Sequence, residues 1–319
     1  MKNISEKMKY VVTGGAGFIG SHLTQELVDQ GEEVTVIDDL STGNQQRLKN
    51  ISDKIKFVNG DIRDLEFLKK EFKGVDFVLH QAALISVPES IEKKELYKEV
   101  NVTGTGNVLE AARTNKVKRV IFSSSAAVYG DTESLPVKES TELKPLSPYA
   151  EFKIKGEQMC AEYYQKHGLK TIVLRYFNVF GPEQDPESEY AVVIPLFIKK
   201  VLENKSPIIY GDGDQTRDFI YIRNIVHANM LALKTDNQEA FGNPINIGSG
   251  QEISINQLLR LVNKNLGKKI EPEFSPEREG DIRHSCSDIS KAKELLGYGN
   301  KYSFEQGLKE TIEWFKNIY

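Results

Sequence analysis

Residues 11–20 read Val-Val-Thr-Gly-Gly-Ala-Gly-Phe-Ile-Gly, and this stretch decides the fold of the first half of the chain. Gly14, Gly17 and Gly20 stand three residues apart, and the amphipathic segment 21–30 that follows predicts a helix. In a strand–turn–helix unit of this kind, one glycine makes the turn, a second lets a pyrophosphate approach the backbone, and a third lets the helix pack on the strand. The free N–H groups at the start of the helix suit a phosphate. The spacing predicts a dinucleotide-binding turn, and a turn without a ligand is the alternative.

A second strand supports the dinucleotide interpretation. Residues 34–37, Val-Thr-Val-Ile, follow the predicted helix and lead into Asp38 and Asp39. An acid about 20 residues beyond the glycines, at the end of the second strand, is where the hydroxyl groups of a ribose would be held. Because a carboxylate disfavours a 2′-phosphate, we expect NAD rather than NADP as the cofactor.

The composition excludes several classes of function. The chain has 319 residues, of which 39% are hydrophobic and 28% charged, which allows one large core with a second lobe. The net charge of −4 argues against a nucleic-acid partner, so any binding of anions must be local. Cys160 and Cys286 make no disulfide framework, which favours a reduced, cytoplasmic setting. No apolar run reaches transmembrane length, and residues 1–7 lack the apolar core of a signal peptide, so we expect no membrane partner.

Strand and helix patterns alternate through the first half of the chain. Continuous apolar runs between helices are typical of a parallel sheet covered on both faces, so the predicted fold is α/β, a Rossmann-type doubly wound parallel sheet. We assign residues 1–177 to an NAD-binding domain and 178–319 to a smaller C-terminal α/β substrate-binding lobe, with 217–234 returning to the first domain. The Pro- and charge-rich segment 181–187 marks the boundary. The predicted strands of the first domain include 34–37, 56–59, 77–80, 119–122 and 171–175.

Small and polar residues follow these strands. Since ligands of such a sheet lie at the carboxyl ends of its strands, these residues are candidates for a site. Asp61 and Ile62 follow the third strand and suit an adenine, and Ala82 follows the fourth in a run of small residues. The serines 123–125 follow the fifth strand, and Asn178 follows the sixth. Each alone is no more than a loop residue that ends a strand, but the set together predicts a site.

Tyr149 and Lys153 form a Y-x-x-x-K pair at the start of a predicted helix, after Ser147 and Pro148. Residues four apart share a helix face. A free tyrosine has a pKa of about 10, and a close ammonium lowers it by about one to three units, so such a tyrosine can take a proton from a substrate hydroxyl. The alternative is an exposed pair on a helix surface.

Further residues are candidates near this pair. The Ser125 hydroxyl could share the substrate proton with Tyr149, with Ser123 and Ser124 as rivals for that role. Asn101 lies within the predicted helix 97–114, where asparagine is mildly unfavourable. Either a buried polar contact to a neighbouring strand or exposure to solvent accounts for it.

Taken together, these motifs resemble those of the extended short-chain dehydrogenases/reductases, and in particular the UDP-hexose 4-epimerases. Among these the sequence is most similar to the enzymes that act on UDP-N-acetylglucosamine. The similarity runs nearly end to end and predicts the two-part fold described above. The segments that carry it are 13–20, 38–43, 123–130, 149–153, 175–181, 217–221 and 278–281.

The resemblance implies a role for each matching residue. Tyr149 would be the catalytic base, with Ser125 and Lys153 beside it. The residues expected to bind NAD are Gly14, Gly17, Phe18, Ile19, Gly20, Asp38, Asp39, Asp61, Ile62, Ala82, Asn101, Tyr149 and Lys153. Those expected to bind the UDP-sugar are Ser86, Ser125, Asn178, Val193, Arg217, Arg278, Asp281 and Ser285. The two arginines suit a pyrophosphate, because a planar guanidinium makes paired charge-assisted hydrogen bonds.

Missing residues separate this chain from related enzymes. Sugar-nucleotide 4,6-dehydratases carry an Asp-Glu pair, and UDP-glucuronate decarboxylases a Glu, near the position where this chain has Ala126 and Ala127. Galactose-type epimerases carry a bulky tyrosine at the position of Ser285, and a lysine where this chain has Ile85 and Ser86. The small Ser285 would leave room for a 2-acetamido group, and Ser86 would touch the sugar.

The resemblance therefore implies NAD-dependent C4 epimerisation of UDP-N-acetylglucosamine to UDP-N-acetylgalactosamine through a 4-keto sugar. UDP-glucose to UDP-galactose is a possible second reaction, since a misfit the size of a methylene costs only about 1–3 kcal/mol. The alternatives are an epimerase of UDP-glucose alone, another oxidoreductase or decarboxylase of the family, and a nucleotide-binding regulatory protein without activity. We expect no metal, and a homodimer formed through helices that include 97–114 and 149–165.

Overall fold

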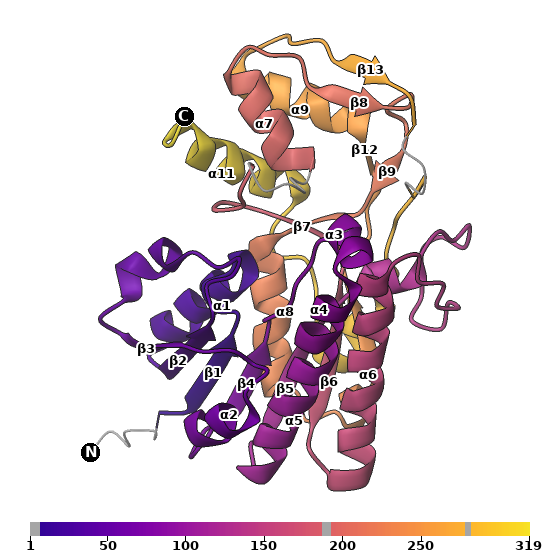
Figure 1. The fold of residues 1–319 in the computed structure, drawn as a ribbon. Coiled ribbons are helices and arrows are strands. Elements are labelled where there is room, and N and C mark those ends of the chain that lie inside the picture. Colours follow the sequence, from indigo (N-terminus) through magenta and orange to yellow (C-terminus); the bar gives the residue numbers. More distant parts are fainter. Residues whose placement is uncertain (1–6, 187–192, 278–281) are drawn as a thin grey trace.

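A seven-stranded sheet lies at the centre of the computed structural model, which describes residues 7–186, 193–277 and 282–319 (Figure 1). Its order is β11-β6-β5-β4-β1-β2-β3, and every neighbouring pair is parallel, which confirms the predicted doubly wound α/β fold. The strands are β1 Lys9–Thr13, β2 Glu33–Asp38, β3 Ile55–Asn59, β4 Phe77–His80, β5 Arg119–Ser125, β6 Thr171–Tyr176 and β11 Pro244–Ile247.

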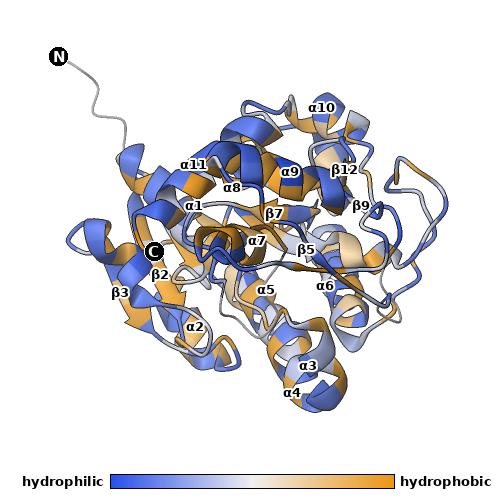
Figure 2. Ribbon diagram, turned by 90° about the horizontal axis from the view of Figure 1, so that it is seen from above, coloured by the Kyte–Doolittle hydropathy of each residue, from blue (hydrophilic) through white to orange (hydrophobic). Residues whose placement is uncertain are grey.

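Helices cover both faces of this sheet, because successive strand residues point to opposite faces and both sets are apolar. Val11 and Val120 pack with residues of α2, α5 and α6, whereas Val12 and Ile121 pack with residues of α1 and α8. Figure 2 shows the apolar residues on the strands and the inner helix faces, with hydrophilic residues outside. The helices are α1 Phe18–Asp29, α2 Leu65–Glu71, α5 Thr105–Thr114, α6 Pro148–His167 and α8 Ile222–Lys234.

The predicted helix 97–114 is helical but changes its winding midway. Helix α4, Lys94–Lys98, runs into a π-helical segment, Glu99–Gly104, before α5 begins. Asn101 is buried in that segment, where its Nδ2 donates to the Leu84 carbonyl at 2.8 Å and its Oδ1 accepts from the Leu84 amide at 2.9 Å. Of the two alternatives, Asn101 is buried, but its partner Leu84 lies in the connection after β4 and not in a strand.

The C-terminal elements gather beyond the carboxyl ends of the strands (Figure 1). Helices α7, α9 and α11 pack on one another, next to the pairs β8–β13 and β9–β12, and β7 pairs with β10. These elements are β7 Asn178–Phe180, α7 Val193–Leu202, β8 Ile208–Tyr210, β9 Thr216–Arg217, β10 Phe219–Tyr221, β12 Ile253–Ser254, α9 Ile255–Leu266, β13 Glu273–Ser275 and α11 Phe304–Lys316. The other short elements are α3 Val87–Glu92, α10 Ser290–Leu296 and three 3₁₀ turns at Gln45–Ile51, Ala126–Tyr129 and Gln238–Ala240. Within the described part of the chain, no helix is both long and apolar enough to span a membrane.

The sequence predicts that the NAD-binding domain ends at residue 177 and the C-terminal lobe begins at 178. Strand β11 does not follow this division. This strand falls in the segment assigned to the lobe, yet it pairs with β6 and forms an edge of the central sheet. All six residues of β6 are buried, so its outer backbone groups need a hydrogen-bonding neighbour, and β11 supplies one. Within the segment 217–234, α8 packs against α1, whereas β10 pairs with β7. A single apolar cluster joins the sheet to α7, α9 and α11, and a two-domain division with separate roles stays a prediction.

Candidate active site

The glycine turn is built as a cradle. Gly14 has φ +68°, and a side chain there would meet the Ala82 amide nitrogen at 2.6 Å, while a side chain on Gly20 would strike the Gly14 carbonyl. Only glycine fits at both positions. Gly17 is the N-cap of α1 and brings no side-chain hydrogen bond, so the first turn of the helix keeps its N–H groups for another acceptor. The amides of this first turn, at the positive end of the helix, fit a pyrophosphate such as that of NAD.

Asp38 lies beside this cradle at the end of β2. Its carboxylate is 7% exposed and accepts from the amides of Ala16 and Leu40, both at 2.9 Å. Burial raises the pKa of Asp38, and the two backbone hydrogen bonds oppose that rise. The exposed Asp39 instead accepts from Ser41 within its own turn. The structure thus places Asp38, and not Asp39, against the glycine turn.

Five of the other residues predicted to bind NAD follow strands β3 and β4 or begin α1. Asp61 follows β3 and pairs with Arg63 at 2.5 Å, and this hydrogen bond lowers the pKa of Asp61. Ile62 is buried against Gly104, and the Ala82 backbone closes the floor of the cradle. Phe18 and Ile19 are the first two residues of α1.

The Tyr149–Lys153 pair lies inside the molecule. Tyr149 is 8% exposed and Lys153 is 4% exposed, which excludes an exposed helix pair. The Lys153 Nζ lies 5.8 Å from the centre of the Tyr149 ring and donates to the Ser123 carbonyl at 2.7 Å. Burial lowers the pKa of Lys153 to about 8, and the charge of Glu157 opposes this effect. Burial raises the pKa of Tyr149, and a hydrogen bond from Ser125 lowers it in part.

The three rival serines of β5 have different hydrogen-bond partners. The Ser123 hydroxyl donates to the His80 carbonyl at 3.1 Å, and the Ser124 hydroxyl donates to Glu157 at 2.5 Å. The Ser125 hydroxyl hydrogen-bonds to Tyr149. Among these three, Ser125 is therefore the serine placed to share a proton with Tyr149.

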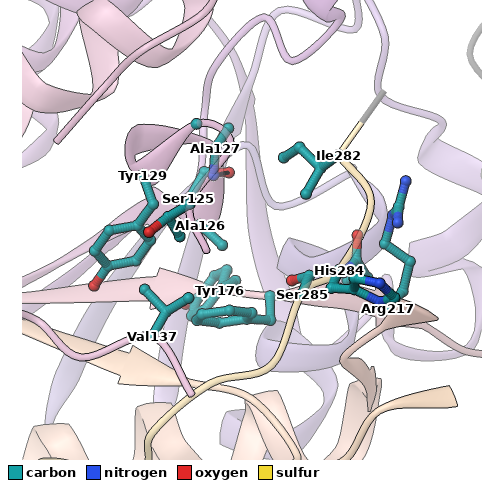
Figure 3. A pocket seen from close by; sticks show the side chains of 14 residues that line it. Ser125, Ala126, Ala127, Tyr129, Val137, Tyr176, Arg217, Ile282, His284 and Ser285 are labelled. Atoms are coloured by element: carbon teal, nitrogen blue, oxygen red, sulfur yellow. Dashed lines mark hydrogen bonds between the residues drawn. The ribbon is translucent and has the colours of Figure 1, made fainter. Parts of the chain in front are cut away.

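A cavity of about 180 Å³ opens where the strand ends meet the C-terminal segments. Figure 3 shows Ser125 and the alanines 126–127 on one side, and Ile282, His284, Ser285 and Arg217 on the other. It brings together four of the predicted substrate residues, which are Ser125, Asn178, Arg217 and Ser285. Several other residues that line the cavity were not predicted, although Ile282 and His284 lie in the same short segment as Ser285. These residues are Tyr129, Gly130, Thr132, Val137, Tyr176, Phe177, Ile282 and His284.

Two of the remaining predicted substrate residues, Ser86 and Val193, do not line this cavity. Ser86 is buried as the N-cap of α3, where its hydroxyl accepts from the Glu89 amide at 3.0 Å. Val193 is the first residue of α7. Arg278 and Asp281 lie outside the described residues. Across the ranges that the structure describes, no group of three His, Cys, Asp or Glu side chains could hold a metal ion.

Two buried carboxylates near the site were not predicted from the sequence. Asp218 is fully buried beside Arg217 and accepts five hydrogen bonds, from the amides of Ser249, Gly250 and Ser287 and from both serine hydroxyls. It thereby ties β9 and β10 to the chain that carries Ser285. Glu157 forms a buried ion pair with Arg175 beneath Lys153. The partners of both carboxylates lie far apart in the sequence, so no local pattern marks them.

The NAD dependent epimerase/dehydratase family model matches residues 10–248. The chain belongs to this family. The UDP-glucose 4-epimerase of Mycolicibacterium smegmatis is 38% identical over 97% of this chain and 99% of that protein. The UDP-glucuronate 4-epimerase of Thermodesulfobacterium geofontis is 36% identical over 96% of each.

Solved structures agree with the family. The UDP-N-acetylglucosamine 4-epimerase from Methanobrevibacter ruminantium, in complex with UDP-N-acetylmuramic acid, has a TM-score of 0.93 at 40% identity and covers 98% of this chain and 100% of that one. The UDP-glucose 4-epimerase of Thermotoga maritima, with UDP-glucose, has a TM-score of 0.92 at 37% identity, with coverages of 98% and 99%. That of Thermus thermophilus, in complex with NAD, has a TM-score of 0.88 at 35% identity, with coverages of 98% and 100%. Together these comparisons support an NAD-dependent UDP-sugar 4-epimerase, and the sugar differs among the relatives.

Proposed function

We propose that this protein interconverts UDP-N-acetylglucosamine and UDP-N-acetylgalactosamine at C4, with UDP-glucose as a second substrate. The observation that carries an epimerase is the buried Tyr149, which is close to Lys153 and hydrogen-bonded to Ser125, a residue that lines the same cavity as Arg217. A base of this kind takes a proton from a hydroxyl group, and NAD, on which this family depends, is the hydride carrier. In this proposal, Tyr149 takes the proton of the sugar O4 and Ser125 shares it.

The remaining site residues bind and orient in this proposal. The glycine turn and Asp38 hold NAD, which, when bound, accepts a hydride and returns it. Lys153 keeps a positive charge next to Tyr149 and so favours the phenolate. Arg217 holds the pyrophosphate from the far wall of the cavity, which lets the 4-keto sugar turn over while its tether stays fixed. Asn178, Val193, Arg278 and Asp281 stay in the proposed set of UDP-binding residues.

Ser285 supports the N-acetylated substrate. It lies on the cavity wall opposite Ala126 and Ala127, and all three side chains are small (Figure 3). A bulky residue at position 285 would occupy the space that an acetamido group needs. The smaller sugar of UDP-glucose also fits a pocket of this size, which supports the second substrate.

Proton NMR of C4 inversion tests this proposal. Purified protein is incubated separately with UDP-N-acetylglucosamine and UDP-glucose, without added NAD and then with it. We expect inversion of both, faster for the N-acetylated sugar. Ser285→Tyr should slow the N-acetylated reaction at least tenfold relative to UDP-glucose, since a bad fit of the acetamido group costs about 1–3 kcal/mol, and Ser285→Ala is the matched control. Inversion of UDP-glucose alone would refute the N-acetyl assignment, and no inversion of either sugar would refute the epimerase.

Assembly and location extend the proposal. We infer a cytoplasmic homodimer formed through α5 and α6, which lie side by side on one face of the sheet (Figure 1). Light scattering coupled to gel filtration gives the mass in solution, and a monomer at micromolar concentration would contradict the dimer.

A further inference from the structure

We propose that Glu157 is a positioning residue for the reaction: its carboxylate, one helical turn from Lys153, keeps the buried Lys153 ammonium charged next to Tyr149, and Arg175 fixes that carboxylate. This inference rests on the proposed function, because it assigns a task to Lys153 in the work of the base. Without this role, the Glu157–Arg175 ion pair would only join α6 to β6.

Charges of alternating sign follow one another along one helix face. Tyr149, Lys153 and Glu157 are spaced by four residues in α6, so they form one stripe facing the sheet. Arg175 on β6 closes the stripe, with Nη2 2.6 Å from one carboxylate oxygen of Glu157 and Nε 2.9 Å from the other. The order is a phenol, an ammonium, a carboxylate and a guanidinium. The carboxylate lies one turn from Lys153 and two turns from Tyr149, so it favours the charged lysine more than it opposes the phenolate.

The carboxylate of Glu157 is firmly held. Glu157 is 7% exposed, and the Ser124 hydroxyl donates to the same oxygen that Arg175 Nε contacts. Arg175 in turn donates to the Tyr129 hydroxyl at 2.8 Å, and Tyr129 donates to Asn246 at 2.6 Å. Tyr129 lines the cavity (Figure 3), so the network runs from beneath Lys153 to the cavity wall. These donors hold the Glu157 carboxylate in one position on the helix face that it shares with Lys153.

Lys153 needs a nearby anion. It is buried, and burial alone lowers its pKa, whereas the charge of Glu157 raises it. The other titratable groups around Lys153 are Cys160 on the same helix and His80 on β4. Burial raises the pKa of Cys160 and lowers that of His80 to about 3, so both are neutral near pH 7. Glu157 is then the group in this set that can offset the cost of a buried ammonium.

The test measures the titration of Lys153 directly. Protein saturated with NAD and labelled with carbon-13 at the Cε of lysine is titrated by NMR, and Lys153→Met assigns the signal. Glu157→Gln removes the anion and leaves a buried guanidinium, so the pKa of Lys153 should fall by about one unit or more. Arg175→Gln removes the cation instead, so the pKa should rise. If the Glu157–Arg175 pair only joined α6 to β6, the two substitutions would not shift the pKa of Lys153 in opposite directions.

Kinetics and a double variant complete the test. The alkaline limb of kcat/KM should move to lower pH in Glu157→Gln and to higher pH in Arg175→Gln. In Glu157→Gln/Arg175→Gln two neutral amides replace the Glu157–Arg175 ion pair, so the thermal midpoint should recover relative to the single variants while the pKa of Lys153 stays below that of the wild type. Ser124→Ala removes a hydroxyl but no charge and should leave the pKa in place. An unchanged pKa in Glu157→Gln, or in the double variant if the single variants do not fold, would overturn the proposal. Because the NMR titration needs no substrate, its outcome is separate from that of the C4 inversion assay.

Discussion

Asp218→Asn tests the idea that one buried carboxylate holds the far wall of the cavity. One oxygen of Asp218 accepts from the Ser249 amide at 2.7 Å and from the Ser249 hydroxyl at 2.6 Å. The other accepts from the amides of Gly250 and Ser287, at 3.1 and 2.9 Å, and from the Ser287 hydroxyl at 2.5 Å. All five partners are donors. Asparagine keeps the shape of the side chain but replaces one oxygen with an NH₂ group.

The magnitude follows from counting the donors that lose their acceptor. The NH₂ group can turn towards Ser249, where the hydroxyl can rotate to accept but the backbone amide cannot. At least one buried amide therefore loses a charge-assisted hydrogen bond, worth about 1.5–3 kcal/mol, and the remaining bonds become neutral and weaker. We expect the free energy of unfolding to fall by about 3 kcal/mol, against a typical total of about 5–15 kcal/mol. Turning the amide the other way costs more, because it faces two backbone amides.

Urea unfolding followed by circular dichroism measures the loss, with the exposed Asp53→Asn as a matched control. The KM for the UDP-sugar should rise as well, because Arg217 adjoins Asp218 and Ser285 lies two residues before Ser287. A loss of less than about 0.5 kcal/mol, which is the range of ordinary surface substitutions, would refute the reasoning.

Three further predictions concern the ionisable groups of the site. Tyr149→Phe should lower kcat by about 10²–10⁴-fold, the usual contribution of a general base, and leave UDP binding measured by calorimetry unchanged. The kcat/KM of the wild type should decline above about pH 8, because Lys153 then loses the charge that favours the phenolate; a flat profile to pH 10 would contradict this. Burial lowers the pKa of His80 to about 3 from its ordinary 6.5. As the pH falls below 6.5, His80 is therefore protonated in the unfolded chain before it is protonated in the folded protein. This should cost about 4 kcal/mol of stability by pH 3, at 1.36 kcal/mol per pKa unit, and acid unfolding of His80→Gln, which cannot titrate, should show a shallower pH dependence.

The sequence predicts most of the fold because its local patterns are strong. Apolar runs of four to six residues become the strands of the sheet, and glycine spacing gives the first turn and helix. The pairing of β11 is different. The run at 245–247 indicates a strand, but its neighbour depends on which strand has an unpaired edge, and that is a property of the assembled sheet. The π-helical segment at 99–104 also has no local signal beyond Asn101 itself.

The candidate site, like the fold, can be predicted only in part from the sequence. Four-residue spacing puts Tyr149 and Lys153 on one helix face, which a sequence can show. It cannot show which of three successive serines faces Tyr149, because that depends on the register of β5 against α6. The Glu157–Arg175 pair spans 18 residues, and the contacts of Asp218 with Ser249 and Ser287 span 31 and 69. Such pairs exist only once the chain has folded.

The two buried carboxylates serve opposite walls of one cavity, and this separates two properties of the site. Glu157 acts on α6 and β5, two long elements of the central sheet and its covering layer, where the base is held. Asp218 acts on the short β9 and β10 and on the chain around Ser285, where the substrate is expected to bind. Changes at Asp218 or Ser285 should therefore move KM and substrate preference, whereas changes at Glu157 should move the pH profile. The 4-epimerases among the relatives differ in their sugar, and a separation of this kind would let the sugar-binding wall change without disturbing the proposed base.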